Sequence, residues 1–198
     1  HMLRKALIIT ALLIPFNNVS AGAIDFRVGE NMAELTFFTQ NASFGYGGAD
    51  IGFGVLVNEY NDVIANGSIL VSGTSAGDVK ALHFGVGAKL YGGDINGPDN
   101  ASVDIQGGAV AIGGQVRYVF PGSAPFAVLG EIFYAPEVTS ISEWDRLLEY
   151  RVALELEVTP SARAYVGYRM LEVEFNTSGV NVDYEVDDSA NIGVRFEF

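Results

Sequence analysis

Ten charged side chains stand at alternate positions in segments whose intervening residues are mostly apolar. Residues at every second position share one face of a β-strand, so these charges would project away from the apolar side. Buried charges need partners of opposite sign. The spacing therefore predicts a network of ion pairs. Its members are Lys89, Arg117, Glu131, Glu149, Arg151, Glu155, Glu157, Arg169, Arg195 and Glu197.

Catalysis would need a different constellation, a histidine held near a serine and a carboxylate. His83 falls on the charged face, near Ser75 and Asp78, but the spacing fixes no chain from nucleophile to base to orienting group. No phosphate-binding loop, dinucleotide fingerprint or zinc-ligand spacing occurs. Residues 94–100 lack the ligand spacing of an EF-hand. We expect no enzyme, metal or cofactor.

The elements that must carry these charges are strands with strict alternation. The clearest runs over residues 149–158, and the last ten residues repeat the pattern and end on Phe198. This final segment resembles the closing strand of bacterial outer-membrane β-barrels, where a terminal phenylalanine with apolar residues at every second position is the assembly signal. The corresponding residues here are Ile192, Val194, Phe196 and Phe198.

The number of strands follows from the same alternation and from the turn residues between segments. Eight strands are predicted from residue 50 onward, and residues 33–40 make a ninth. Residues 24–29 would supply a tenth, or residues 24–48 would lie outside the wall as an insert in the lumen. The predicted fold is all-β, an antiparallel up-and-down transmembrane β-barrel of 8–10 strands, and we favour ten because such barrels have even strand numbers.

The connections and the aromatic residues suggest how the barrel would lie in a membrane. Residues 121–125 and 159–162 make short turns, whereas 92–102, 137–145 and 176–188 look like longer acidic loops. Short turns face the periplasm in outer-membrane barrels, and counting back from the last strand places them on that side. Aromatic residues expected at the two membrane boundaries are Phe120, Phe126, Phe196 and Phe198 at one edge and Tyr134, Trp144 and Tyr150 at the other.

The amino terminus predicts export. Arg4 and Lys5 precede an apolar run too short to span a bilayer as a helix, and small residues follow at both candidate cleavage sites. Residues 1–23 are therefore expected to be a signal peptide, with His1 a cloning remnant, and residues 24–198 a single barrel domain in the bacterial outer membrane.

Composition narrows the class of protein further. Without Arg4 and Lys5, nine basic residues face 24 acidic ones, a formal charge of −15, which argues against nucleic acid as a partner. The chain has no cysteine, so no disulfide can stabilise it after export. Closing a β-sheet on itself into a barrel is another way to stabilise an exported chain.

Three segments resemble the YfaZ family of small outer-membrane proteins: residues 130–137 (GEIFYAPE), 166–169 (VGYR) and 195–198 (RFEF). The start at Ile24-Asp25 with Val28-Gly29, the glycine-rich early strands and the terminal phenylalanine agree with that layout. The resemblance implies a small outer-membrane barrel and supplies no functional residues.

These observations predict a structural protein of the cell envelope whose lumen is filled by the ion-pair network. A narrow channel for small solutes is the alternative, and a lipid-active enzyme using His83 is a third. A soluble periplasmic barrel is the competing fold. The expected partners are outer-membrane lipid and lipopolysaccharide, together with the barrel-assembly machinery, which would read the C-terminal strand.

Overall fold

A computed structural model of the protein describes residues 22–41, 48–74, 81–96, 105–122, 125–177 and 180–198. The expected signal peptide therefore lies almost wholly outside the described residues. The elements are β1 (Gly22–Gly29), β2 (Met32–Asn41), β3 (Ala49–Asn58), β4 (Val63–Thr74), β5 (Leu82–Ile95), β6 (Ile105–Val119), β7 (Phe126–Ala135), η1 (Glu137–Thr139), β8 (Ser140–Ser142), β9 (Trp144–Thr159), β10 (Ala162–Thr177) and β11 (Val180–Glu197).

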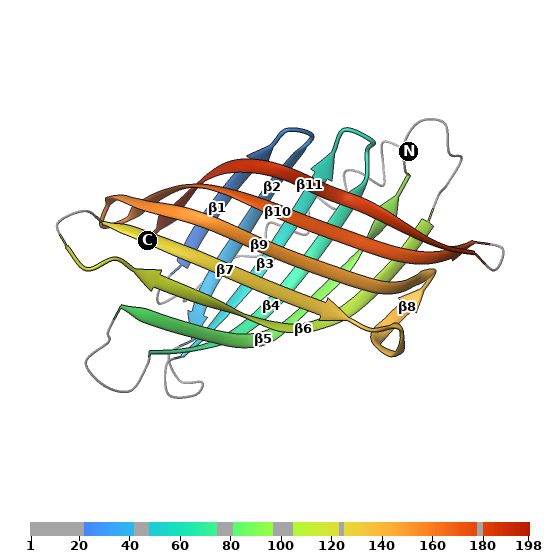
Figure 1. Ribbon diagram of the computed structural model, residues 1–198, viewed down its shortest axis with the longest axis horizontal. Helices are drawn as coiled ribbons and strands as arrows, with labels where there is room; N and C mark the ends of the chain where they lie inside the picture. The colour runs from blue at the N-terminus through green and yellow to red at the C-terminus, as the bar shows by residue number, and fades with distance from the viewer. Residues whose placement is uncertain (1–21, 42–47, 75–80, 97–104, 123–124, 178–179) are drawn as a thin grey trace.

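Ten of the strands close into an antiparallel barrel in which every strand pairs with its neighbours along the wall (Figure 1). The ring runs β5-β4-β3-β2-β1-β11-β10-β9-β7-β6 and returns to β5, while three-residue β8 pairs only with β6. The prediction of a ten-stranded barrel is confirmed. Both β1 and β2 belong to the wall, so the alternative of an insert in the lumen is wrong.

The first and last described residues meet where the barrel closes. The backbone amide of Gly22 donates to the carbonyl of Phe198 at 2.8 Å, and that of Phe198 donates to Gly22 at 2.9 Å. We call this end of the barrel the terminal end. The opposite end, which carries the β1–β2 and β3–β4 turns, is the distal end. Strand β1 begins two residues before residue 24, and the domain boundary there stays a prediction.

The predicted segregation of short and long connections is confirmed only in part, since the β6–β7 and β9–β10 connections lie at the terminal end as expected, but short connections occur at the distal end too. Only two residues separate β1 from β2, and two separate β10 from β11, both at the distal end. The segment at 176–188, expected as an acidic loop, is strand throughout its described part, because β10 and β11 continue their alternation through it. Asp183 of this segment points to the outer side, where Arg146 pairs with it at 3.2 Å and with Glu174 of β10 at 2.8 Å. Asp187 is instead buried, with its carboxylate 3.9 Å from Arg169.

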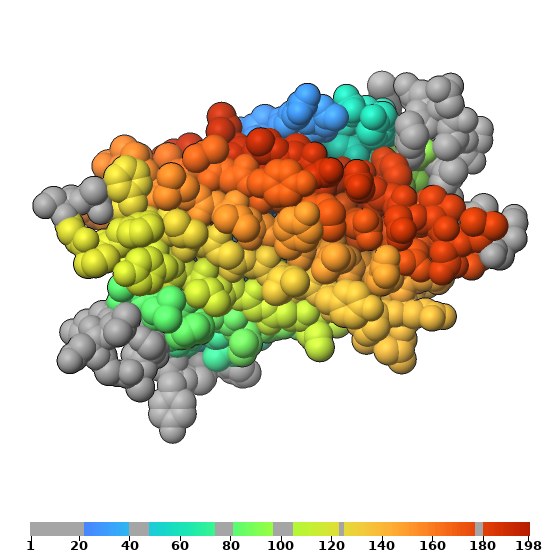
Figure 2. All heavy atoms as spheres, in the orientation of Figure 1, coloured from blue at the N-terminus to red at the C-terminus, as the bar shows by residue number. Residues whose placement is uncertain are grey.

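The outer surface of the barrel is apolar over most strands. Exposed aliphatic and aromatic side chains include Phe53, Val86, Ile112, Ile132, Val152, Val166 and Ile192. Figure 2 shows the face over β7 and β9–β11 as a continuous wall. Along β10 the apolar outward residues stop at Met170 and are followed by Glu172 and Glu174, so the distal parts of β10 and β11 extend beyond the lipid-facing band. A soluble barrel would have a polar exterior, which this one lacks.

No helix within the described ranges is both long and apolar enough to cross a membrane.

Candidate functional site

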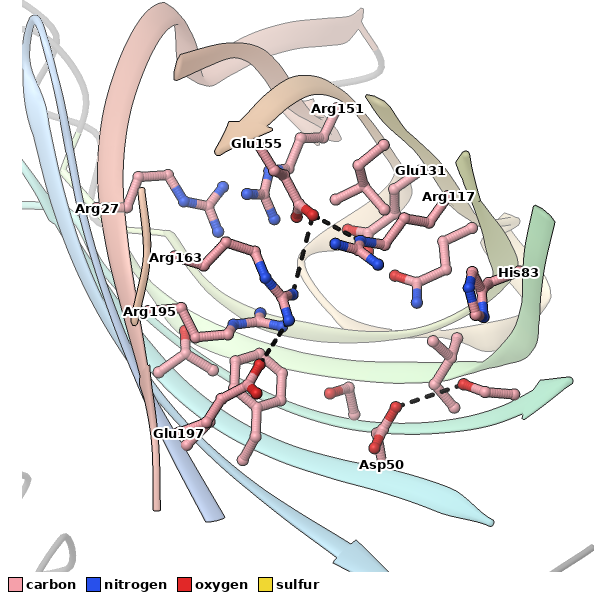
Figure 3. A pocket seen from close by; sticks show the side chains of 18 of the residues that line it. Arg27, Asp50, His83, Arg117, Glu131, Arg151, Glu155, Arg163, Arg195 and Glu197 are labelled. Carbon is pink, nitrogen blue, oxygen red and sulfur yellow. Dashed lines mark hydrogen bonds and ion pairs between the residues drawn. The ribbon is translucent and has the colours of Figure 1, made fainter. Parts of the chain in front are cut away.

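The lumen contains a cavity of about 570 Å³ that extends inward from the terminal end. Gly22, Pro160, Ser161, Glu197 and Phe198 line its mouth. Alternation along the strands turns the charged residues inward, and Figure 3 shows them converging from several strands. On a lipid-facing surface each basic side chain would cost about 2–4 kcal/mol at mid-membrane, so the sequence allows this register and disfavours a one-residue slip.

The ion pairs nearest the mouth link side chains of adjacent or next-but-one strands. Arg117 Nε lies 2.6 Å from Glu155 Oε2, and Arg163 Nη2 lies 2.7 Å from Glu197 Oε1. Arg195 Nε donates to Asp25 Oδ2 at 3.1 Å. Tyr165 donates to the other oxygen of the same carboxylate at 2.5 Å. These groups are partly wet, since Glu197 and Arg195 keep 43% and 26% of their side chains exposed.

A second group of charges lies deeper and is almost wholly buried. Arg169, with 2% of its side chain exposed, places Nη1 2.5 Å from Glu34 Oε2 and Nε 2.8 Å from Glu149 Oε1. Lys89 Nζ lies 2.5 Å from Glu131 and 2.8 Å from Glu149. Tyr91 donates a hydrogen bond to Glu149. We call Arg27, Glu34, Lys89, Glu131, Glu149 and Arg169 the charged layer.

Beyond the charged layer the lumen is filled by apolar side chains, which we call the apolar plug. Tyr91 and Phe133 of the plug also line the cavity and so form its floor, whereas Leu70 of the same cluster lies opposite Asp50 near the terminal end and lines the cavity wall. Trp144, Leu147, Leu171 and Val173 have at most 2% of their surface exposed. The complete cluster is Met32, Leu56, Ile64, Leu70, Tyr91, Ile95, Ile105, Ala109, Ala111, Phe133, Ala135, Trp144, Leu147, Leu171, Val173, Phe175 and Val186.

Hydrogen bonds among Tyr184, Asp62 and Asn58, which we call the polar latch, lie at the distal end next to the plug. Tyr184, on the part of β11 beyond the lipid-facing band, donates to buried Asp62 Oδ2 at 2.8 Å. Asn58 donates to the same oxygen at 2.8 Å and to the carbonyl of Val186 at 3.2 Å. Removal from water, and then the bond to Asp62, raise the pKa of the Tyr184 hydroxyl, which keeps it a donor. The extended β10–β11 pair is thereby tied to the β3–β4 turn.

The structure places nine of the ten predicted network residues in the lumen, eight of them in ion pairs. Glu157 is exposed near the mouth, and within the described ranges it forms no ion pair. Arg151 is buried but has no acidic partner there; its guanidinium lies 4.7 Å from the centre of the Tyr165 ring.

Sequence reasoning missed several members of the site. Asp25, Arg27 and Glu34 lie in β1 and β2, whose place in the wall was open, and continuing the alternation through those segments would have found them. Arg163 shares the face of Arg169 but was left out of the predicted set.

Trp144 contradicts its predicted place at the membrane boundary. It is 2% exposed and packs inside the barrel over Gly107, where an added Cβ would overlap the indole ring. A register irregularity in the β9–β10 pairing skips Asp145 and places Trp144 on the same inward face as Leu147 and Glu149.

His83 lies at the edge of the cavity, opposite Arg117 in the β5–β6 pairing. Ser75 and Asp78 lie outside the described residues. In the part of the chain that the structure describes, no hydroxyl or carboxylate is hydrogen-bonded to His83. That the protein is not an enzyme stays a prediction.

A closed antiparallel barrel that is apolar outside and charged inside is a bacterial outer-membrane β-barrel protein. The chain belongs to the YfaZ family, since the family model described as "YfaZ precursor" matches residues 3–198. A precursor family agrees with an exported chain that carries a signal peptide.

Comparison with solved structures finds other barrels at low identity. The outer membrane channel DcaP of Acinetobacter baumannii is 10% identical with a TM-score of 0.44 over 88% of this chain, which spans only 54% of DcaP. The KdgM porin is 11% identical with a TM-score of 0.43, over 90% of this chain and 99% of that one. The NanC porin is 14% identical with a TM-score of 0.42, over 89% and 97%. No curated protein matches the chain in sequence.

Proposed function

We propose that the protein is a structural component of the outer membrane, a barrel whose lumen does not conduct from one side to the other. The observation that carries this proposal is the apolar plug, whose central side chains are at most 2% exposed. Water and ions need polar contacts or continuous free volume to cross, and close-packed aliphatic and aromatic groups offer neither.

The narrow channel is the second candidate, and the cavity is the feature that favours it. Charges line the lumen for part of its length, as they would in a conduit. The exposed fraction of these side chains falls from 43% at Glu197 through 26% at Arg195 to 2% at Arg169. The wet path thus narrows toward the charged layer and meets the plug beyond it.

Conductance in planar bilayers separates the two candidates. Purified protein should insert without producing stable open steps, and its insertion is checked by recovering a folded band that migrates faster before boiling than after. Stable steps on the nanosiemens scale from such a preparation would show a through-channel and sink the sealed-barrel proposal.

The partners proposed for this role are lipid and the assembly machinery. The apolar outer surface suits outer-membrane lipid, and the acidic distal surface suits divalent cations that bridge to lipopolysaccharide phosphates. Ile192, Phe196 and Phe198 are exposed on the outer side of β11, where the barrel-assembly machinery could read them.

A lipid-active enzyme using His83 is the third hypothesis. It predicts that purified protein cleaves or transfers acyl chains and that His83→Ala removes the activity. We expect no activity in either protein on phospholipid or lipid A.

A further inference from the structure

Most acidic side chains around the cavity have cationic partners, and Asp50 accepts from the Ser72 hydroxyl at 3.4 Å. Glu34 faces Arg27 and Arg169, and Glu131 and Glu149 share Lys89. Nearer the mouth, Glu155 lies within 4 Å of Arg117 and Arg163, and Asp25 accepts from Arg195. Apart from Asp50, these carboxylates are therefore occupied by guanidinium or ammonium groups.

Arg151 stands apart from this pairing. It is only 6% exposed, lines the cavity and has no ion pair within the described residues. Its neighbour across the β7–β9 pairing, Glu131, turns to Lys89 instead. The guanidinium lies on the ring of Tyr165, and its buried Nε has no hydrogen-bond acceptor. A stacked ring compensates part of a positive charge but accepts no ordinary N–H hydrogen bond in the guanidinium plane.

Arg27 has spare donors of the same kind. It is 7% exposed and uses Nη2, 3.1 Å from Glu34, while its Nε and Nη1 are buried without an acceptor. Figure 3 shows Arg27 and Arg151 both directed into the cavity. Two buried guanidinium groups with unused N–H groups are unfavourable unless an acceptor binds them; water can accept the hydrogen bonds, but only an anion also compensates the two positive charges.

We propose that the cavity is a binding site for a small oxyanion, a carboxylate or a phosphate group, held by Arg27 and Arg151. Guanidinium groups present paired N–H donors whose spacing fits the oxygens of either group. The volume of about 570 Å³ lies in the range of small-molecule pockets and accommodates an organic acid or a phosphate ester as well as the free ion. The ligand enters from the terminal end, past Arg163 and Arg195. This proposal goes beyond the structural role and does not depend on it.

Calorimetric titration of the refolded protein with inorganic phosphate and with citrate tests the site and separates the two oxyanions. At least one should bind with saturation, and chloride at equal ionic strength should not. Arg151→Gln should weaken binding about tenfold or more, the loss expected for a charge-assisted hydrogen-bonding partner. Arg151→Lys keeps the charge but loses the paired N–H donors of the guanidinium, so its affinity should lie between those of the wild type and Arg151→Gln.

Arg146→Gln is the matched control, because Arg146 lies on the outer side of the barrel among Glu172, Glu174 and Asp183. It should bind like the wild type. The bound anion should also raise the melting temperature of the wild type and of Arg146→Gln but not of Arg151→Gln. Each protein is compared with itself without the anion, so the readout holds even if Arg151→Gln has a different intrinsic stability. Absence of saturable binding by the wild type, or equal affinity in Arg151→Gln, would overturn the proposal.

Discussion

Arg169 is the side chain on which the inner ion pairs converge. It lies within 3 Å of both Glu34 and Glu149, and all three are almost completely buried. Arg169→Met would leave two carboxylates close together without this partner. We expect a loss of about 3–5 kcal/mol in the free energy of unfolding, the usual effect of breaking a buried pair. Urea titration followed by the shift between folded and unfolded bands on gels measures it.

The same substitution at Arg146 provides the comparison. Arg146 also contacts three carboxylates, but 39% of its side chain is exposed. Solvent screening limits such pairs to about 0–1 kcal/mol, so Arg146→Met should change stability little. Equal losses in the two variants would show that the charged layer is no more important to stability than a surface network.

Within the wall, β5 approaches β4 and β6 approaches β7 so closely that one position in each pair requires glycine. Gly87 of β5 and Gly113 of β6 are paired with each other, and a Cβ at either would overlap a backbone carbonyl, of Ile69 or of Ile132. Gly113→Ala should therefore destabilise the barrel by about 1–3 kcal/mol, as overpacking does. The folded fraction at intermediate urea concentration reports it.

Gly130 of β7 serves as the control for Gly113. Nothing lies within 4 Å of a Cβ added there, so Gly130→Ala should stay within about 0.5 kcal/mol of the wild type. A Gly113→Ala variant as stable as Gly130→Ala would mean that the close approach of the strands is not needed for closure.

The closing strand β11 has two separable roles, pairing and recognition. Phe198 contributes backbone hydrogen bonds to Gly22, while its side chain is 74% exposed. Phe198→Ala should therefore change the stability of refolded protein little but lower the amount assembled in cells severalfold. Phe120→Ala, at another exposed aromatic residue of the terminal end, should assemble normally. Equal assembly of both variants would contradict recognition of the terminal side chain.

The alternation in sequence was sufficient to predict the strands within the lipid-facing band, because a period of two follows from backbone geometry alone. It placed Glu149, Arg151 and Arg169 in the lumen for the same reason. It did not reveal the apolar plug, since Leu171, Val173 and Trp144 are apolar residues that sit where a lumen was expected to be charged. Which inward-facing residues pack together in the plug depends on the lengths of the strands that face each other across the lumen. Those facing strands are defined only in the closed barrel, not in the sequence of one strand.

The extended β10–β11 pair explains why the segment at 176–188 was taken for a loop. Its outward residues are acidic because they lie beyond lipid, which removes the polar-in, apolar-out pattern used to recognise wall strands. Its inward residues, Val173, Phe175 and Val186, are apolar because they pack into the plug. In this extended part of β10 and β11 the outward face is polar and the inward face apolar, the inverse of the pattern in the lipid-facing band. Only the hydrogen bonds to partner strands distinguish the segment from a loop.

The whole barrel is thus divided along its axis into a charged cavity open at the terminal end and an apolar plug latched at the distal end. The proposal of a lumen that carries many charges without forming a through-path rests on this division. The division also assigns different consequences to substitutions in the two halves: those in the cavity alter binding and ion pairing, and those in the plug alter packing and permeability.

Thiol accessibility in oriented vesicles tests this division most directly, because the chain has no cysteine of its own. Ser68 lines the cavity, whereas Ala109 lies in the plug and is fully buried. Ser68→Cys should react with a charged, membrane-impermeant maleimide added at the terminal end and not at the distal end, and Ala109→Cys should react from neither. Reaction of Ala109→Cys from both sides in a folded barrel would contradict the account and show an open lumen.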